Sequence, residues 1–104
     1  MKKSRYAPSI LDTEPGTCYL CKQERETVRH EVFYGTANRR VSIENGFWIN
    51  VCPRCHRKIH LYMDRDEYRK RVQAPCQARY LETHTRDEFY DLLHEFYDID
   101  EEDE

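Results

Sequence analysis

The stretch CPRCHRKIH at residues 52–60 places four metal-binding side chains within nine positions. Cys52 and Cys55 are three positions apart around a proline, which is the spacing of a zinc knuckle. His56 and His60 are four positions apart, so on a helix both imidazoles would lie on one face, a turn apart. The stretch therefore predicts a thiolate-bearing turn followed by a short helix that carries both histidines.

A second pair of cysteines, Cys18 and Cys21, has the same spacing about thirty residues upstream. Four thiolates bind zinc tetrahedrally and leave no open position on the ion, so the two pairs predict one structural Zn²⁺ site. The histidines then stay free for another purpose. The alternative interpretations are two unrelated pairs or a redox couple, but redox pairs usually occur singly beside a parallel sheet, which this sequence does not predict.

The chain of 104 residues suits a single small domain, and 38% hydrophobic against 36% charged residues predict a thin apolar core. Such chains often need a metal or disulfides to fold. No apolar run has the pattern of a signal peptide or a membrane span, so we expect an intracellular protein whose paired cysteines bind metal. Cys76 has no such partner and is expected to be a small buried residue rather than a ligand or a reactive thiol.

The formal net charge of −3 conceals two oppositely charged regions. Residues 1–80 hold 16 Lys or Arg against 9 Asp or Glu, and residues 81–104 hold one Arg against 11 acids. A basic body suits a polyanionic partner, whereas an acidic tail suits solvation, screening of the basic face or contact with a basic protein. We expect a flexible segment over 1–16, one zinc-stapled domain over 17–97 and an acidic tail over 98–104.

Two strands are predicted between the cysteine pairs. Residues 27–34 are rich in β-branched and aromatic side chains, and residues 47–51 follow an Asn-Gly turn signal at 45–46. Residues 36–45 are polar and are expected to form a loop between the strands. The short helix with both histidines is expected over about residues 55–62.

Further short helices are predicted towards the C-terminus. Capping-box patterns at residues 64–67 and 85–88 mark two helix starts, and Ala74-Pro75 is expected to interrupt the first helix. An apolar stripe at helical spacing follows the second box and predicts core packing rather than a groove for a partner. The stripe consists of Phe89, Leu92, Leu93 and Phe96.

His30, on the first predicted strand, is the natural third partner for the two helix histidines, because the strands should lie against the helix that follows them. Three imidazoles can bind a divalent ion and leave a position open for water or a phosphate oxygen. We therefore consider a second metal site at His30, His56 and His60. The alternative interpretation is that the two helix histidines assist the zinc knuckle or lie on an exposed helix by chance.

A ββα unit with Cys-x-x-Cys-His at the joint between strand and helix resembles the zinc-stapled branch of the HNH (ββα-metal) endonucleases. More narrowly, the segment HEVFYGTANRRVS at residues 30–42, Gly46 and residues 51–60 are similar to small HNH-like proteins of bacteriophages. The likeness continues into residues 86–89 and covers roughly residues 18–97. It implies a small α+β fold, in which a ββα-metal unit with Cys₄ zinc knuckles precedes two or three short helices. It also implies a location in the cytoplasm of a bacterial host cell.

In that family the first motif is a pair of residues, of which the first binds the ion and the second is the general base. The resemblance therefore implies that His30 binds an ion such as Mg²⁺, Mn²⁺ or Ni²⁺ together with His56 and His60. Glu31 then occupies the position of the base, which is a departure, since a carboxylate is a weaker base than an imidazole at neutral pH. In the alternative register His30 is the base and Arg29 the ligand, which a permanently protonated guanidinium cannot be.

The family also has a middle asparagine, for which Asn38, Asn45 and Asn50 are candidates. Asn45 precedes a glycine and suits turn chemistry, so Asn38 is the residue expected to orient the first strand and its metal ligand. The catalytic residues that the resemblance implies are His30, Glu31, Asn38 and His56.

Several basic residues surround the proposed site in the sequence and are expected to hold a phosphate backbone, unless they form only a solvated face. They are Arg39, Arg40, Arg54, Arg57 and Lys58.

The first functional hypothesis is a metal-dependent phage endonuclease that cuts or nicks DNA. The second is an HNH-like zinc protein that has lost cleavage and inhibits a host defence nuclease, in the manner of an anti-CRISPR protein. Its partner would be a basic nucleic-acid-binding protein such as a CRISPR effector, whose DNA channel the acidic tail would block by charge mimicry. The third is a zinc-stapled adaptor or oligomer. No membrane partner is expected.

Overall fold

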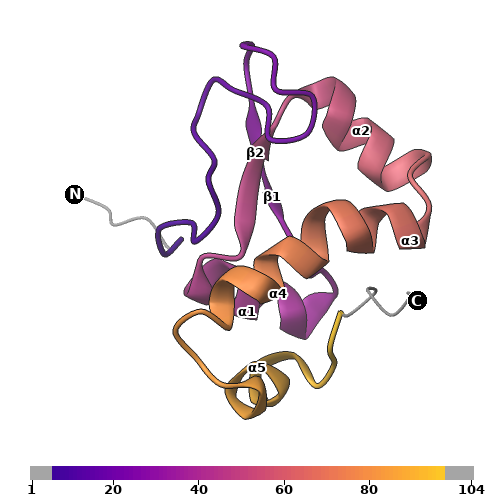
Figure 1. Ribbon diagram of the computed structural model, residues 1–104. Helices are drawn as coiled ribbons and strands as arrows, with labels where there is room; N and C mark the ends of the chain where they lie inside the picture. The colour runs from indigo at the N-terminus through magenta and orange to yellow at the C-terminus, as the bar shows by residue number, and fades with distance from the viewer. Residues whose placement is uncertain (1–5, 98–104) are drawn as a thin grey trace, which may run out of the picture.

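The computed structural model describes residues 6–97, and the predicted acidic tail at 98–104 lies outside the described residues. The described chain is a small α+β structure with a two-stranded sheet (Figure 1), as the sequence predicted. Among residues 6–97, no helix is both long enough and apolar enough to cross a membrane. The elements in chain order are β1 (Val28–Glu31), α1 (Thr36–Asn45), β2 (Trp48–Val51), α2 (Pro53–Leu61), α3 (Arg65–Tyr68), a π-helical segment (Arg69–Gln73), α4 (Ala74–Tyr80) and α5 (Arg86–Leu93).

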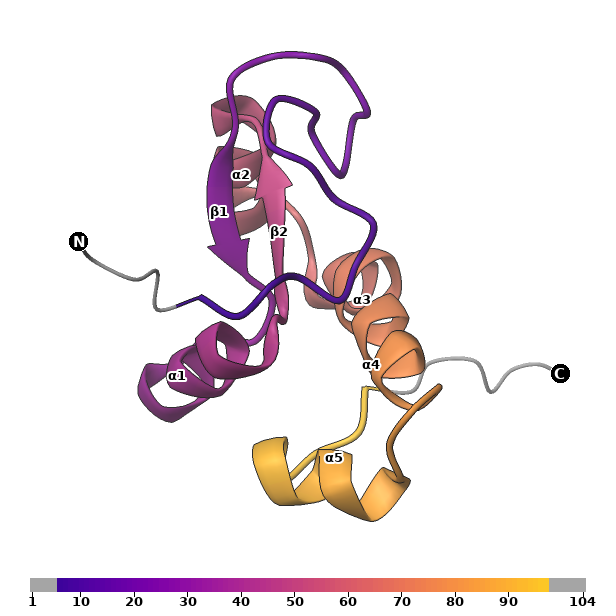
Figure 2. The ribbon, with the colours of Figure 1, turned by 90° about the vertical axis from the view of Figure 1, so that its left-hand side faces the viewer.

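The two strands form an antiparallel pair in which Val28 lies opposite Val51 and His30 lies opposite Ile49. His30, Ile49 and Val51 are buried. α2 packs against this sheet and follows β2 directly along the chain (Figure 2). The arrangement places the histidine-bearing helix beside β1, as the sequence predicted.

The segment between the strands is the helix α1, where the sequence predicted a polar loop. Tertiary contacts explain the difference. Ile43 is buried, and the buried hydroxyl of Ser42 accepts a hydrogen bond from the Phe33 N–H at 3.1 Å and donates to the Phe33 carbonyl at 2.9 Å. These contacts fix one side of α1 to the chain that follows β1, so packing rather than a strong amphipathic pattern stabilises the helix.

The Asn45-Gly46 pair, expected as a turn between strands, instead ends α1. Gly46 has a left-handed φ of 75°, and its N–H donates to the carbonyl of Ser42. A Cβ at this position would lie 2.1 Å from the carbonyl oxygen of Pro8, so the close approach of the N-terminal segment also requires glycine. Hairpin turns and helix C-termini both use a glycine with positive φ, and the dipeptide alone does not distinguish them.

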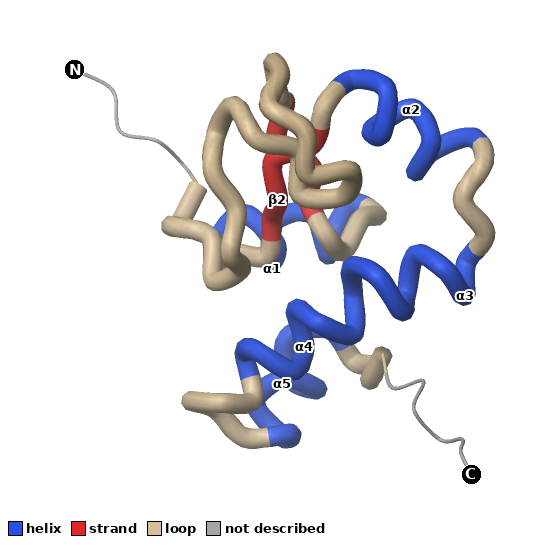
Figure 3. Tube along the Cα trace, turned by 45° about the horizontal axis from the view of Figure 1, so that its top comes forward, coloured by secondary structure: helices blue, strands red, loops and turns tan. Residues whose placement is uncertain are grey.

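α3, the π-helical segment and α4 form one continuous helical rod (Figure 3). Asp64 caps its start as predicted, because its carboxylate accepts from the Glu67 N–H at 2.8 Å. The expected break at Pro75 does not occur. A proline lacks an N–H, and its ring crowds the carbonyl four residues earlier. Because of this crowding the preceding turn is wider, and the Ala74 N–H donates to the Arg69 carbonyl, five residues back.

The capping box at the start of α5 is confirmed: Thr85 accepts from the Glu88 N–H and Glu88 accepts from the Thr85 N–H. The helix ends earlier than its apolar stripe suggested, because His94 adopts a left-handed φ of 61°. Phe96 therefore lies beyond the helix and stacks on Phe89, with ring centroids 5.9 Å apart. The buried aromatic residues of the core are Phe33, Phe47, Tyr68, Tyr80, Phe89 and Tyr97.

Residues 6–16, predicted to be flexible, make specific contacts with β2. The Trp48 indole N–H donates to the Ala7 carbonyl at 2.7 Å, and the Ser9 hydroxyl donates to the Trp48 carbonyl at 2.6 Å. Leu11 from the same segment is buried in the core. The sequence did not reveal these contacts because they join residues 41 and 39 positions apart.

Candidate metal centre

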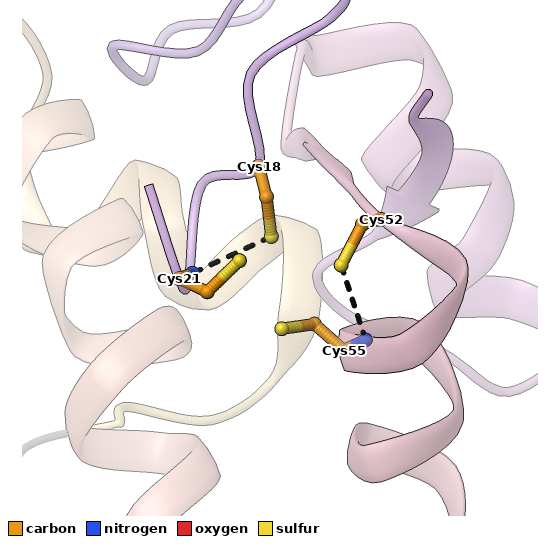
Figure 4. A group of neighbouring side chains, drawn as sticks. All are labelled: Cys18, Cys21, Cys52 and Cys55. Carbon is orange, nitrogen blue, oxygen red and sulfur yellow. Dashed lines mark hydrogen bonds between the residues drawn. The ribbon is translucent and has the colours of Figure 1, made fainter. Parts of the chain in front are cut away.

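The four paired cysteines meet where β2 joins α2 (Figure 4). Their sulfur atoms all lie within 4.8 Å of one another, which confirms the predicted convergence. Zn–S bonds of about 2.3 Å in a tetrahedron place the sulfurs about 3.8 Å apart, a spread that this cluster accommodates. The four thiols are not joined in disulfides. The cluster of Cys18, Cys21, Cys52 and Cys55 could therefore hold a metal ion.

The two cysteine pairs have the same local geometry. The Cys21 N–H donates to the sulfur of Cys18, and the Cys55 N–H donates to the sulfur of Cys52, each at 3.4 Å (Figure 4). Pro53 stands at the first position of α2, where a missing N–H is tolerated. Backbone N–H groups that point at sulfur favour the thiolate, which is the form that binds metal.

These hydrogen bonds oppose burial in setting the acidity of the thiols. Burial alone would raise the pKa of Cys18, but backbone hydrogen bonds from Cys21, Cys52 and Leu20 lower it to about 6. The pKa of Cys52 is also lowered, because hydrogen bonds with Cys55 outweigh its burial. Burial and hydrogen bonds with Cys18 and Cys52 raise the pKa of Cys55 to about 12. A bound cation would have to displace the remaining protons, so metal affinity at this cluster should fall in acid.

Cys76 lies apart from the cluster and is fully buried in the core, as predicted. Burial raises the pKa of its thiol, which keeps it protonated. It therefore serves the protein as a small core residue.

Three imidazoles form a second cluster. His30 of β1 and His56 and His60 of α2 each offer a nitrogen within 4.8 Å of the others, so their predicted convergence is confirmed. The Nε2 atoms of His56 and His60 are 3.2 Å apart, close to the roughly 3.3 Å between two nitrogens bound at 2.0–2.1 Å to a tetrahedral ion. His30 is buried, His56 is half-buried and His60 is exposed, so the cluster is open to solvent on the side of α2.

Tyr68 fixes the orientation of His30. Its hydroxyl donates to the Val32 carbonyl at 2.5 Å and lies 2.8 Å from His30 Nε2. A phenol has one proton, and here that proton is given to the carbonyl, so the phenol oxygen accepts from a protonated Nε2 of His30. The lone pair of His30 is then on Nδ1, which is the atom left free to bind a cation.

Burial of His30, together with the charges of His56 and His60, lowers its pKa to about 3. The pKa of His56 is also lowered, by burial and by His60, with Glu31 acting in the opposite direction. A neutral imidazole is the form that binds metal. The buried member of the cluster is therefore in its metal-binding form at neutral pH.

Glu31, the residue at the expected position of the base, is engaged by other side chains. Its carboxylate accepts a hydrogen bond from the Tyr6 hydroxyl and pairs with the Arg39 guanidinium at 3.5 Å. The Arg29 guanidinium stacks on the ring of Tyr6, 4.3 Å from its centroid. Neighbouring residues on a strand point to opposite faces, so these contacts hold Glu31 towards the N-terminal segment while His30 faces the other imidazoles.

The candidate asparagines differ in their surroundings. Asn38 is half-buried on α1, and its side chain makes no hydrogen bond to any residue in the described part of the chain. The Asn45 side chain bonds within α1. Asn50 is buried on β2, and its side-chain Nδ2 has no partner among residues 6–97. No hydrogen bond joins the Asn38 side chain to His30.

The predicted phosphate-binding residues fall into two groups. On α1, Arg39 pairs with Glu31, and Arg40 pairs with Glu44 at 3.7 Å. The α2 group is exposed, forms no ion pair within residues 6–97 and lines a hollow in the surface. It consists of Arg54, Arg57 and Lys58.

Sequence reasoning missed the two tyrosines beside the site. Tyr68 is 38 positions from His30, and Tyr6 is 25 positions from Glu31. A tyrosine near a helix start or in a polar N-terminal segment has no local signal of such a contact. Only the packing of α3 and of the N-terminal segment against β1 reveals it.

Comparisons of the chain with protein-family models, with curated proteins and with solved structures find no match. The two side-chain clusters therefore provide the basis for a functional proposal.

Proposed function

We propose that this protein is an HNH-like, metal-dependent endonuclease that cuts or nicks DNA. A structural Zn²⁺ would bind the four cysteines, and a second divalent ion, such as Mg²⁺, Mn²⁺ or Ni²⁺, would bind the three histidines. The observation that carries the proposal is that nitrogens of His30, His56 and His60 come within 4.8 Å of one another from β1 and α2. The resemblance of residues 30–60 to HNH-like phage proteins supports the same function.

Zinc is proposed for the cysteine cluster because four thiolates in a tetrahedral arrangement suit zinc and leave no position for a substrate. The cluster joins the loop before β1 to the first turn of α2. It would therefore hold the strand and the helix that carry the imidazoles in a fixed relation. The proposed role is structural, with folding free energy supplied by metal binding.

The imidazoles suit a catalytic ion because they leave it open to other ligands on the solvent side of α2. A divalent ion bound there would act as a Lewis acid towards a phosphate oxygen. His30 would bind through Nδ1, with Nε2–H held by Tyr68, and His56 and His60 would bind through their facing Nε2 atoms. Glu31 would have to leave its contacts with Tyr6 and Arg39 and turn towards the ion before it could take the proton of the attacking water.

The test is conversion of supercoiled plasmid to nicked or linear DNA in the presence of Mg²⁺, Mn²⁺ or Ni²⁺. His56→Ala should abolish conversion, because it removes a ligand at a half-buried helix position while leaving the core intact. His84→Ala is the matched control, since His84 is exposed and lies outside both clusters. Conversion by the His56→Ala protein at the rate of the His84→Ala protein would exclude the proposed site.

One observation favours a second function, the inhibitor of a host defence nuclease. Glu31 is held by Tyr6 and Arg39 and is not free to act as a base in this arrangement. An HNH-like scaffold without a working base could instead bind a basic nucleic-acid-binding protein, such as a CRISPR effector, and block its DNA channel. That function predicts no plasmid conversion, inhibition that survives His56→Ala, and loss of inhibition when residues 98–104 are removed.

A further inference from the structure

A surface hollow of about 570 Å³ lies beside the cysteine cluster. Cys21 and Cys55 line it, together with Arg25 from the loop after the first knuckle and basic residues of α2. Arg54 and Lys58 are each two positions from His56, which corresponds to about 200° around a helix. The hollow therefore lies on a different face of α2 from the imidazoles.

The hollow concentrates positive charge that has no acidic partner. No Asp or Glu lines it, and none of its four cations forms an ion pair within the described part of the chain. Elsewhere on the surface, Arg39, Arg40, Arg71 and Arg79 are each paired with a carboxylate. Other exposed cations of residues 6–97 that form no ion pair, such as Arg65 and Lys70, do not line the hollow. The four cations of the hollow are Arg25, Arg54, Arg57 and Lys58.

The neighbouring cysteines do not account for all of this charge. Four thiolates around a divalent ion carry a net charge of about −2. The positive charge of three guanidinium groups and one ammonium group is larger than this negative charge, so the hollow keeps an excess of positive charge when the cysteines hold a divalent ion. An unpaired basic surface of this kind suits the phosphates of a nucleic acid.

An exposed aromatic ring completes the hollow. Tyr62, directly after α2, is 76% exposed and lines the same surface as the four cations. A base stacks on such a ring only when it is unpaired, since the faces of paired bases are covered by their neighbours in the duplex. Cations beside an exposed aromatic ring are the combination that binds single strands with little sequence preference.

We propose that this hollow binds single-stranded nucleic acid, with phosphates at Arg25, Arg54, Arg57 and Lys58 and a base stacked on Tyr62. The inference rests on the proposed function and specifies its substrate class, a nucleic acid with an unpaired segment beside the position of cleavage. The bound nucleic acid would contact both faces of α2. The hollow would hold the unpaired segment that is not cut, and the imidazole face would hold the phosphate that is cut. Every residue of this site is distinct from the imidazole cluster.

The test is fluorescence anisotropy with a labelled oligothymidylate of about twenty nucleotides and with a duplex of the same length. The protein carries His56→Ala, so that binding is measured without the proposed catalytic ion. The single strand should bind at least about tenfold more tightly than the duplex, and affinity should fall steeply between about 50 and 200 mM salt. Equal affinity for the two probes would overturn the proposal.

Two substitutions with matched controls locate the binding. Tyr62→Ala should weaken single-strand binding roughly tenfold, since one stacked base is lost, whereas Tyr90→Ala on α5 should not. Lys58→Glu should weaken it at least about tenfold, whereas Lys70→Glu, the same charge change at an exposed position away from the hollow, should have a small effect. Equal effects of each substitution and its control would exclude the hollow. Zinc content and circular dichroism confirm that each variant is folded, and Tyr62→Ala leaves the charge around the thiolates unchanged.

The two proposals can fail separately. Binding at the hollow without plasmid conversion by the wild-type protein would leave this inference in place and remove the endonuclease. Plasmid conversion that is lost with His56→Ala, combined with no preference for a single strand, would retain the endonuclease and remove the hollow.

Discussion

The cysteine cluster and the histidine cluster each draw ligands from α2, and each gathers its ligand atoms within 4.8 Å. They differ in whether a bound ion would have positions left for other ligands. Three of the four cysteines are buried, and four thiolates occupy all four coordination positions of a tetrahedral ion. The histidines range from buried to exposed, and three ligands leave the ion open. One helix can therefore supply a closed site suited to stability and an open site suited to chemistry, depending on which face bears the ligands.

The largest effect should come from breaking the closed site. Cys52→Ala should abolish metal binding at the cysteines and prevent stable folding, because structural zinc contributes about 10–16 kcal/mol, as much as the whole stability of a small domain. Cys76→Ala removes an equally buried thiol outside the cluster and should cost only about 1 kcal/mol. Thermal unfolding by circular dichroism and metal content by native mass spectrometry measure both. A cooperative transition at the wild-type temperature for Cys52→Ala would contradict the structural role.

Chelation should separate the two sites. The open histidine site is expected to lose its ion to a weak chelator, with loss of plasmid conversion and little change in circular dichroism. The closed cysteine site should resist until a strong chelator is added, and the fold should then be lost. If activity and helical signal disappear at the same chelator concentration, the distinction between an open and a closed site is wrong.

Acid should act on the histidine cluster through His30. The folded protein keeps this imidazole neutral down to about pH 3, whereas the unfolded chain takes up a proton near pH 6.5. The unfolded state therefore binds more protons in this window, and stability falls as the pH is lowered from about 6.5 towards 3, by up to about 1.4 kcal/mol per pH unit. Urea unfolding at several pH values checks this. His30→Gln should remove this contribution to the slope, whereas the contribution from acid loss of metal at the cysteines should remain in both proteins.

The smallest effect should be confined to the histidine site. Tyr68→Phe removes the acceptor for His30 Nε2–H, which should cost about 1–3 kcal/mol of stability and lower affinity at the histidines by about 10–100-fold. Metal content at the cysteines should not change. Tyr80→Phe is the control, because Tyr80 is also buried in the core but its ring stacks on His84 and not on His30, His56 or His60. Titration with Co²⁺, followed by its absorption spectrum, distinguishes thiolate from imidazole ligation. Equal Co²⁺ affinity of the two variants at the histidines would show that Tyr68 does not position the ligand.

Local spacing was sufficient to predict the two cysteine pairs, the histidine pair of α2 and several helix starts. The two Cys-x-x-Cys pairs, the histidines four apart and the capping box at Thr85 each depend on residues within one or two turns of each other. Such patterns are set by backbone geometry and hold in many tertiary contexts. The position of His30 opposite α2 followed from the order of strand and helix.

Spacing along the chain indicates which side chains could bind metal and which of them share a knuckle or a helix face. Long-range packing determines that residues 36–45 form a helix, that the chain passes Pro75 through a π-helical turn, and that Glu31 is held by Tyr6. The same packing determines that Tyr68 orients His30 and that Arg25 joins the basic face of α2. The two sets of features differ in how far apart along the chain the interacting residues are. Spacing and propensity act over a few residues, whereas these contacts join segments far apart in the sequence and exist only once the core is packed.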